Sequence, residues 1–176
     1  IEVLNAREVG GEPVADLRVL YAPLHGIDVP EALVPLAIDE FPVLFVAACC
    51  ATGQTRVTGA EELRVKESDR IQSMVDGLSA LGTVIEGTPD GAVIRGGGPD
   101  FRFAGGSVEA HEDHRIAMAF SVAGLVSREP IVVNDCANVA TSFPNFVGLA
   151  RETGFPLTVS SLLFLSLPLM ARAGLE

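Results

Sequence analysis

The sequence has no tryptophan, one tyrosine and only three cysteines in 176 residues. Cys49, Cys50 and Cys136 are odd in number, and their spacing fits neither a disulfide framework nor a zinc site. We therefore expect reduced, buried thiols. Basic residues are also scarce, because 12 Lys and Arg stand against 23 Asp and Glu, for a net charge of −11. This balance, with no basic stripe, argues against nucleic acid as a partner. An acidic protein of this kind binds anions only through a local pocket.

Long hydrophobic runs are missing too. The apolar runs at residues 41–51 and 159–170 are too short to span a bilayer, and no signal peptide opens the chain. We expect a cytoplasmic protein with no membrane partner. The three histidines lie outside any HExxH or CxxC context, so no structural metal is expected. The length suits one domain with a substantial core, and the first residue, Ile1, indicates a piece of a longer protein.

Apolar periodicity and turn signals predict an α/β protein in which strands and helices alternate. Strands are predicted at residues 1–5, 16–21, 54–58, 83–86, 92–95, 101–103, 107–110, 130–134 and 156–160. Helices are predicted at residues 43–51, 68–81, 116–126 and 142–154. The pattern of elements repeats with a period of roughly 60 to 75 residues. Residues 1–160 are assigned to one lobe, and residues 161–176, which are Leu-rich without amphipathic order, to a tail of uncertain structure.

The segment 63–70 precedes a predicted helix, and five of its eight residues are charged. Ser68 or Asp69 can cap that helix, which places Lys66, Glu67 and Arg70 around its first turn. The helix dipole disfavours cations at this end, so these cations are better explained by an anionic ligand. The alternative is a capped surface helix whose ion pairs are solvated. The segment alone leaves both interpretations open.

Three other predicted helix starts carry functional groups, namely Asp39, residues 113–115 and residues 141–142. Equivalent helix ends point the same way in repeated α/β units, so the four starts are expected to converge on one face. Cations there would hold phosphate or carboxylate oxygens, and carboxylates would move protons. Each member also has a simpler interpretation: Asp39 and Asp113 as helix caps, His114 as a core histidine, Arg64 and Arg95 as solvated side chains.

Three motifs in this order carry a family resemblance: residues 63–70, residues 113–119 and residues 141–144. They resemble the C-terminal lobe of 5-enolpyruvylshikimate-3-phosphate (EPSP) synthase. Residues 38–42 are similar to the form found in bacteria whose enzyme tolerates glyphosate. The related UDP-N-acetylglucosamine enolpyruvyl transferase shares the fold but not these motifs. The resemblance implies repeated βαβαββ units, an inside-out α/β barrel with mixed parallel and antiparallel strands, and no cofactor.

The resemblance also implies transfer of the enolpyruvyl group of phosphoenolpyruvate to the 5-hydroxyl of shikimate 3-phosphate. By motif position, Asp39 resembles the proton acceptor at that hydroxyl, and Glu67 the acid–base group at the phosphoenolpyruvate methylene. The substrate-binding positions are Lys66, Arg70, Arg115, Asp113, His114 and Thr141. Some members carry a lysine where this chain has Thr141.

The resemblance extends to about residue 153, and the N-terminal lobe of the family is absent from these residues. Two hypotheses follow. The chain is an enolpyruvyl transferase, alone or with an N-terminal half, or it is an isolated lobe that folds and holds an anion weakly. Without the opposing lobe, water stays in the cleft, so the chain alone is expected to be nearly inactive.

Overall fold

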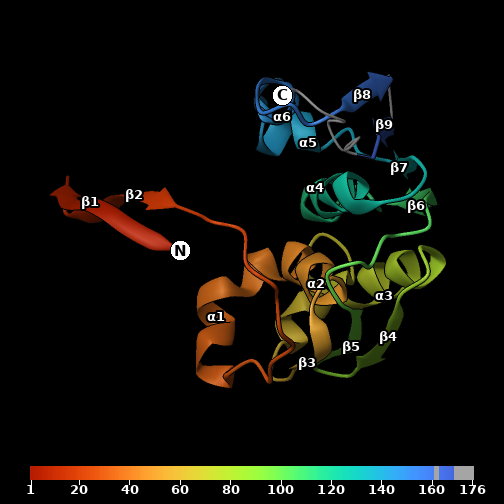
Figure 1. Cartoon of the computed structure of the whole chain (residues 1–176), viewed down its shortest axis with the longest axis horizontal. Helices are drawn as coiled ribbons and strands as arrows, with labels where there is room; N and C mark the ends of the chain where they lie inside the picture. Colours follow the sequence, from red (N-terminus) through yellow and green to blue (C-terminus); the bar gives the residue numbers. More distant parts are fainter. Residues whose placement is uncertain (161–162, 169–176) are drawn as a thin grey trace.

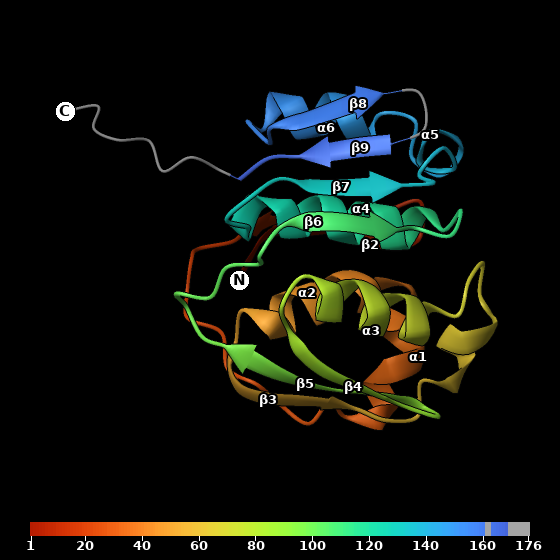
Figure 2. The same ribbon diagram turned by 90° about the vertical axis from the view of Figure 1, so that its right-hand side faces the viewer.

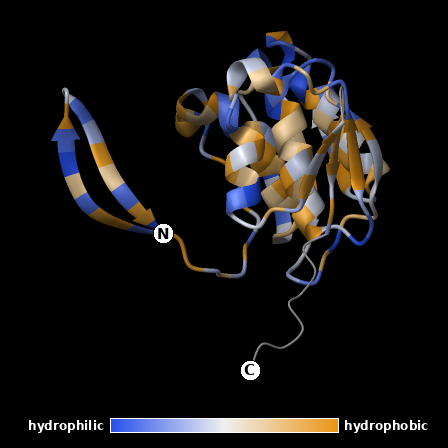
Figure 3. Ribbon diagram, turned by 90° about the horizontal axis from the view of Figure 1, so that it is seen from above, coloured by the Kyte–Doolittle hydropathy of each residue, from blue (hydrophilic) through white to orange (hydrophobic). Residues whose placement is uncertain are grey.

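The computed structural model describes residues 1–160 and 163–168 (Figure 1). An N-terminal hairpin is formed by β1 (Glu2–Val9) and β2 (Glu12–Arg18), which pair antiparallel. Gly10 and Gly11 make its turn, with φ of 61° and 87°, values that glycine adopts without strain. No residue of the hairpin is buried, and Figure 3 shows it projecting from the rest of the protein. The predicted strands at 1–5 and 16–21 are thus confirmed in kind. Both extend further toward the turn, and the second ends at Arg18, so residues 19–21 form no strand.

The first α/β unit begins with an extended segment at residues 24–29, which runs parallel to β3. Thr52 N donates to Leu24 O at 2.8 Å, and Val29 N donates to Arg56 O at 2.9 Å. The sheet then continues in the order β3-β5-β4, with antiparallel neighbours. The helices of the first unit are the 3-10 helices η1 (Glu31–Leu33), η2 (Ile38–Glu40) and η3 (Glu61–Val65) and the α-helices α1 (Val34–Ala37), α2 (Phe41–Cys49) and α3 (Arg70–Ala80). Its strands are β3 (Thr52–Val57), β4 (Val84–Thr88) and β5 (Gly91–Gly97).

The second unit has the same strand order. β6 runs parallel to β7, β7 pairs antiparallel with β9, and β9 pairs with β8, giving β6-β7-β9-β8. Its elements are β6 (Gly106–Glu109), α4 (His114–Ala123), η4 (Gly124–Val126), β7 (Ile131–Asn134), α5 (Val139–Ser142), α6 (Phe146–Glu152), β8 (Leu157–Ser160) and β9 (Leu163–Ser166). The predicted repeat of mixed α/β units is confirmed, although the described strands form separate sheets and close no barrel.

Helices α2 and α3 lie against the first sheet, and α4 lies against the second sheet and packs on α2 (Figure 2). Their facing sides are apolar and fully buried, with Phe45, Met74 and Phe120 among the largest side chains of the core. Helices α3 and α4 approach closely at Gly77, where a Cβ atom would lie 2.2 Å from the ring of Phe120. This packing brings the N-terminal ends of α2, α3 and α4 to the same region, which is the geometry that positions the site.

Two predictions about this part of the chain are wrong. Residues 101–103 form no strand, because Phe103 makes only an isolated bridge to Ser127. The predicted helix at 142–154 is shorter in the structure, because α6 covers only Phe146–Glu152. Ser142 instead ends the separate helix α5, after which Phe143 leaves the helical conformation (φ −139°, ψ 75°). The following Pro144 disfavours a helical conformation at that residue.

The predicted tail also contains structure. Leu163–Ser166 forms β9, which lies inside the second sheet between β7 and β8, with Phe164 and Ser166 buried. A short apolar run with no polar alternation is typical of a strand covered on both faces. The rest of that prediction, at residues 161–162 and 169–176, lies outside the described residues.

The segment Glu31–Cys49 is long and apolar enough to cross a membrane by length and composition. It is nevertheless four consecutive helical pieces, from η1 to α2, rather than one regular helix. Phe41, Phe45 and Cys49 from its last piece are buried in the protein core. The apolar helical segment therefore begins at Glu31, before the run at residues 41–51 that was expected to be too short to span a bilayer.

Candidate active site

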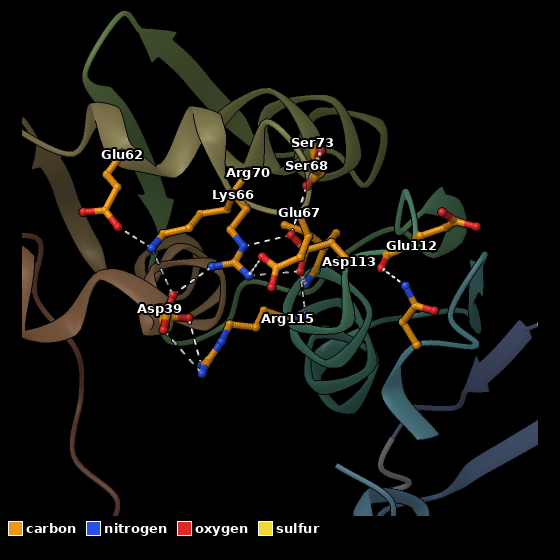
Figure 4. A network of polar contacts seen from close by, with 12 residues as sticks. Asp39, Glu62, Lys66, Glu67, Ser68, Arg70, Ser73, Glu112, Asp113 and Arg115 are labelled. Atoms are coloured by element: carbon orange, nitrogen blue, oxygen red, sulfur yellow. Dashed lines mark hydrogen bonds and ion pairs between the residues drawn. The ribbon is translucent and has the colours of Figure 1, made fainter. Parts of the chain in front are cut away.

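Five charged side chains from three separate segments meet in one network around Asp39 (Figure 4). Arg70 Nη1 donates to Asp39 Oδ1 at 3.0 Å, and Lys66 Nζ lies 3.8 Å from the same oxygen. Arg115 Nη1 donates to the backbone oxygen of Asp39 at 3.1 Å, and its Nη2 lies 3.7 Å from Oδ2. Glu67 accepts a hydrogen bond from Arg70 Nη2 at 2.6 Å. The expected convergence of Asp39, Lys66, Glu67, Arg70 and Arg115 is thus present.

Asp39 is available to these cations because it caps no helix. It lies in η2, and α2 begins two residues later at Phe41, with no side-chain hydrogen bond at either helix start. Pro42 occupies the first turn of α2 and has no N–H to be capped. The interpretation of Asp39 as a helix cap is therefore wrong, and its carboxylate is about half exposed.

The loop that carries Lys66 and Glu67 is held from both sides. Asp69 caps α3 by accepting a hydrogen bond from Gln72 N at 3.0 Å, which resolves the choice between Ser68 and Asp69. Arg64 donates to Asp69 Oδ2 at 2.8 Å and, through Nε, to Pro89 O at 2.8 Å in the β4–β5 turn. A further hydrogen bond joins Arg64 to Thr88 O. The prediction that Arg64 is merely solvated is wrong.

Asp113 links the two units from the interior. Its side chain is fully buried, and Oδ2 accepts from Arg70 Nε at 2.8 Å and from Ser68 Oγ at 3.1 Å. Its Oδ1 accepts from the backbone N–H of Arg115 at 2.9 Å, so the cap predicted for this helix is confirmed. Arg70 is only 1% exposed. Both charges are taken out of water and compensate each other, which is the condition for tolerating them inside a protein.

The cations control the ionisation of these carboxylates. Partial burial opposes ionisation of Asp39, but the hydrogen bond from Arg70 and the charges of Arg115 and Lys66 outweigh it, so its pKa is lowered. Burial likewise opposes ionisation of Asp113, yet the hydrogen bond and charge of Arg70 lower its pKa. The site therefore holds both groups as carboxylates at neutral pH.

A hollow of about 380 Å³ lies beside this network. Its walls come from the start of α2, from α4 and from the segment after α5: Asp39, Glu40, Pro42, Val43, His114, Arg115, Met118, Ala119, Val122, Ser142 and Phe143. His114 is the first residue of α4 and is partly exposed, so its interpretation as a core histidine is wrong. Thr141 lies within α5 rather than at a helix start, and its neighbour Ser142 reaches the hollow.

Sequence reasoning missed two carboxylates of the network. Glu40 accepts a hydrogen bond from Arg115 Nη1 at 2.5 Å, and Glu62 pairs with Lys66. One signal was present, because Glu62 lies four residues before Lys66, a spacing at which opposite charges attract on a helix. Glu40 gave no such signal, since its partner is far away in the chain.

The three cysteines are reduced thiols; Cys49 and Cys136 are buried as expected, whereas Cys50 is only partly buried. Burial raises the pKa of Cys49 to about 12. Among residues 1–160 and 163–168, no group of three or more His, Cys, Asp or Glu side chains is arranged to hold a metal ion.

Comparison with known proteins identifies first the fold and then the family of this chain. The fold matches the enolpyruvyl transferase NikO of Streptomyces tendae, with a TM-score of 0.53 at 12% identity over 75% of this chain and 30% of that one. The EPSP synthase (3-phosphoshikimate 1-carboxyvinyltransferase) family model matches residues 2–149. The chain belongs to this family.

Individual relatives agree with this assignment. The 3-phosphoshikimate 1-carboxyvinyltransferase of Methylococcus capsulatus is 65% identical over 91% of this chain, and that of Acidithiobacillus ferrooxidans 60% identical over 92%. The structure of EPSP synthase from Acinetobacter baumannii matches with a TM-score of 0.82 at 54% identity, over 86% of this chain and 35% of that one. The chain spans about 36% of the length of the two curated relatives.

Proposed function

We propose that this chain forms one wall of an EPSP synthase active site in the cytoplasm. The reaction is transfer of the enolpyruvyl group of phosphoenolpyruvate to the 5-hydroxyl of shikimate 3-phosphate, with release of phosphate. The observation that carries the proposal is the contact of Asp39 and Glu67 with the same guanidinium, that of Arg70. Addition–elimination needs one proton delivered to carbon and one removed from oxygen while anionic charge is held, and this arrangement offers two carboxylates among cations.

The roles divide by position. Asp39 accepts the proton of the attacking hydroxyl, and Glu67 exchanges a proton with the methylene carbon of phosphoenolpyruvate. Arg115 lines the hollow, and Arg70 lies beside it, so both hold the carboxylate or phosphate of that substrate. Lys66 holds shikimate 3-phosphate. Asp113 does not line the hollow and supports Arg70 from behind. His114 and Ser142, beside Thr141, complete the wall of the substrate site.

Substrate binding also prepares Asp39 as a base. In the free protein, its lowered pKa makes it a weak proton acceptor, since hydrogen bonding by Arg70 and the charges of Arg115 and Lys66 favour the carboxylate. Anionic groups of the substrates draw Arg115 and Lys66 toward themselves. The positive charge at Asp39 then decreases and its basicity rises, so proton transfer becomes favourable only when both substrates are bound.

A second candidate function is that of an isolated anion-binding lobe without turnover. It is favoured by the exposure of Asp39 and Glu67, whose side chains are 47% and 50% exposed. Water at such carboxylates weakens both electrostatics and positioning. We propose that the remaining length of the relatives supplies the opposing wall.

Phosphate release from shikimate 3-phosphate and phosphoenolpyruvate separates the two functions. The chain is assayed alone and joined to the N-terminal two-thirds of the Methylococcus relative. We expect turnover only in the joined protein. In that protein, Glu67→Gln and Arg115→Ala should each reduce kcat at least 100-fold, about the scale of one proton-transfer group. The exposed Arg95→Gln serves as control. Full activity of either site variant contradicts the assignment, and full turnover by the chain alone contradicts the need for an opposing wall.

A further inference from the structure

Two of the three cations of the site, Arg115 and Lys66, are also paired with exposed carboxylates at its edge. Arg115 Nη1 lies 2.5 Å from Glu40 Oε1. Lys66 Nζ pairs with Glu62 Oε1 (Figure 4). The hydrogen bond that Lys66 donates to Glu62 raises the pKa of Lys66 and keeps it cationic. Glu40 is the N-cap residue of α2, but its side chain makes no capping hydrogen bond, and the carboxylates of both pairs are exposed. Arg115 and Lys66 are thus already paired with carboxylates in the free protein.

The charges of the network show why this matters. Three cations, Lys66, Arg70 and Arg115, stand against the carboxylates of Asp39, Glu40, Glu62, Glu67 and Asp113, which gives a formal charge of −2. An anionic ligand is repelled by such a site. If the carboxylates of Glu40 and Glu62 turn away, the remaining charges balance and the two cations are free to bind.

The exposed fraction of each side chain distinguishes the carboxylates that can separate from their cations from the one that cannot. The side chains of Glu40 and Glu62 are 60% and 59% exposed, so each can exchange its cation for water at small cost. Asp113 is fully buried against Arg70 and has no such alternative. Arg70 is therefore a fixed cation, whereas Arg115 and Lys66 are cations whose partners can be exchanged.

We propose that Glu40 and Glu62 are internal counter-ions that compete with anionic substrates for Arg115 and Lys66. The proposal rests on the proposed function only in its choice of phosphate and carboxylate ligands. Both residues set the affinity of the site for anions: they hold the cations in place in the empty site and rotate into solvent when a phosphate or carboxylate group arrives. Glu40 and Glu62 are thus specificity-determining residues of the site without contacting the reacting atoms.

The experiment measures binding of inorganic phosphate and of phosphoenolpyruvate to the 176-residue chain by NMR titration at low ionic strength. Glu40→Gln and Glu62→Gln keep the shape of each side chain and remove its charge. Each should strengthen binding roughly two- to five-fold, the range expected for an exposed ion pair. The double variant should combine both gains, with shift changes at the amides of Lys66 and Arg115.

Glu61→Gln is the matched control, because Glu61 is exposed in the same 3-10 helix and makes no ion pair with any described residue. It changes the net charge equally and should alter affinity less than two-fold. An equal gain in Glu61→Gln, or no gain in the double variant, overturns the proposal. Stronger phosphate binding in the double variant, together with no turnover by the joined protein, leaves the inference standing and defeats the proposed function instead.

Discussion

Asp69 and Asp113 do the same local task in two very different places. Each precedes a helix and accepts a hydrogen bond from a backbone N–H in its first turn, Asp69 for α3 and Asp113 for α4. Asp69 lies at the surface, 39% exposed, and its ion-pair partner is Arg64. Asp113 is fully buried, and its partner Arg70 comes from the other unit.

This difference shows how one local signal serves two tertiary purposes. At Asp69, the surrounding water can replace the ion pair, so the cap is the main contribution. At Asp113, no water is available, and removing either charge leaves the other buried without compensation. The same pair also fixes the guanidinium that contacts Asp39 and Glu67. Stability and site geometry are therefore coupled at Asp113 and separate at Asp69.

The largest expected effect comes from Asp113→Asn. Asparagine retains an acceptor oxygen for the cap but leaves Arg70 with counter-ions on one edge only. We expect the free energy of unfolding to fall by about 3 kcal/mol, at the lower end for a broken buried ion pair because Asp39 and Glu67 remain. Urea denaturation measures the loss. Asp69→Asn makes the same change at the exposed cap and should stay below about 1 kcal/mol; equal losses would contradict the distinction between the two caps.

The pH dependence of stability sharpens the same comparison. Because Arg70 lowers the pKa of Asp113 below its unfolded value, this carboxylate stabilises the protein fully above the unfolded pKa, about 3.9. That contribution is lost as the pH falls through the lower, folded pKa. Asp113→Asn should therefore give a flatter decline of stability below about pH 4 than the unaltered chain. Parallel acid profiles for the two proteins would show that Asp113 is not the group responsible.

A smaller effect is expected from Arg64→Gln. The substitution removes the ion pair with Asp69 and the hydrogen bonds to the β4–β5 turn, including that to Pro89 O. We expect a loss of about 1–2 kcal/mol and faster amide hydrogen exchange at Lys66 and Glu67, which lie on the loop that Arg64 holds.

Arg95→Gln is the control for this prediction, because Arg95 is exposed on β5 and its side chain makes no hydrogen bond or ion pair within the described part of the chain. It should change stability by less than about 0.5 kcal/mol. Unchanged hydrogen exchange at Lys66 and Glu67 in Arg64→Gln would show that the loop keeps its structure without the arginine.

The parts of this structure that the sequence predicts depend on short-range rules. Asp69 and Asp113 precede apolar helical runs, and both are caps. The turn before Gly91 separates two strands that pair as expected. The convergence of Asp39, Arg70 and Arg115 followed from a longer-range rule, the common direction of equivalent helices in repeated units.

Other features depend on partners that no local pattern identifies. Nothing near Asp113 in the sequence indicates that Arg70 lies against it, and nothing near Glu40 indicates Arg115. The alternating burial of Leu163–Ser166, in which Phe164 and Ser166 are buried and the two leucines are partly exposed, has no counterpart in its mainly apolar sequence, so the sequence pattern does not identify β9 as a strand. In each case the deciding contact joins residues far apart in the chain.

The smallest effect tests whether Asp69 is only a cap. Asp69→Ala removes the acceptor for Gln72 N and the exposed pair with Arg64, and should cost about 1 kcal/mol of folding free energy. Asp69→Asn restores the acceptor without the charge, so it should recover most of that loss. If asparagine instead destabilises the protein as much as alanine does, the ion pair with Arg64 contributes more than the cap. Asp69 would then resemble Asp113, whose ion pair also dominates its contribution to stability. Urea denaturation of the two variants and the unaltered chain decides between these outcomes.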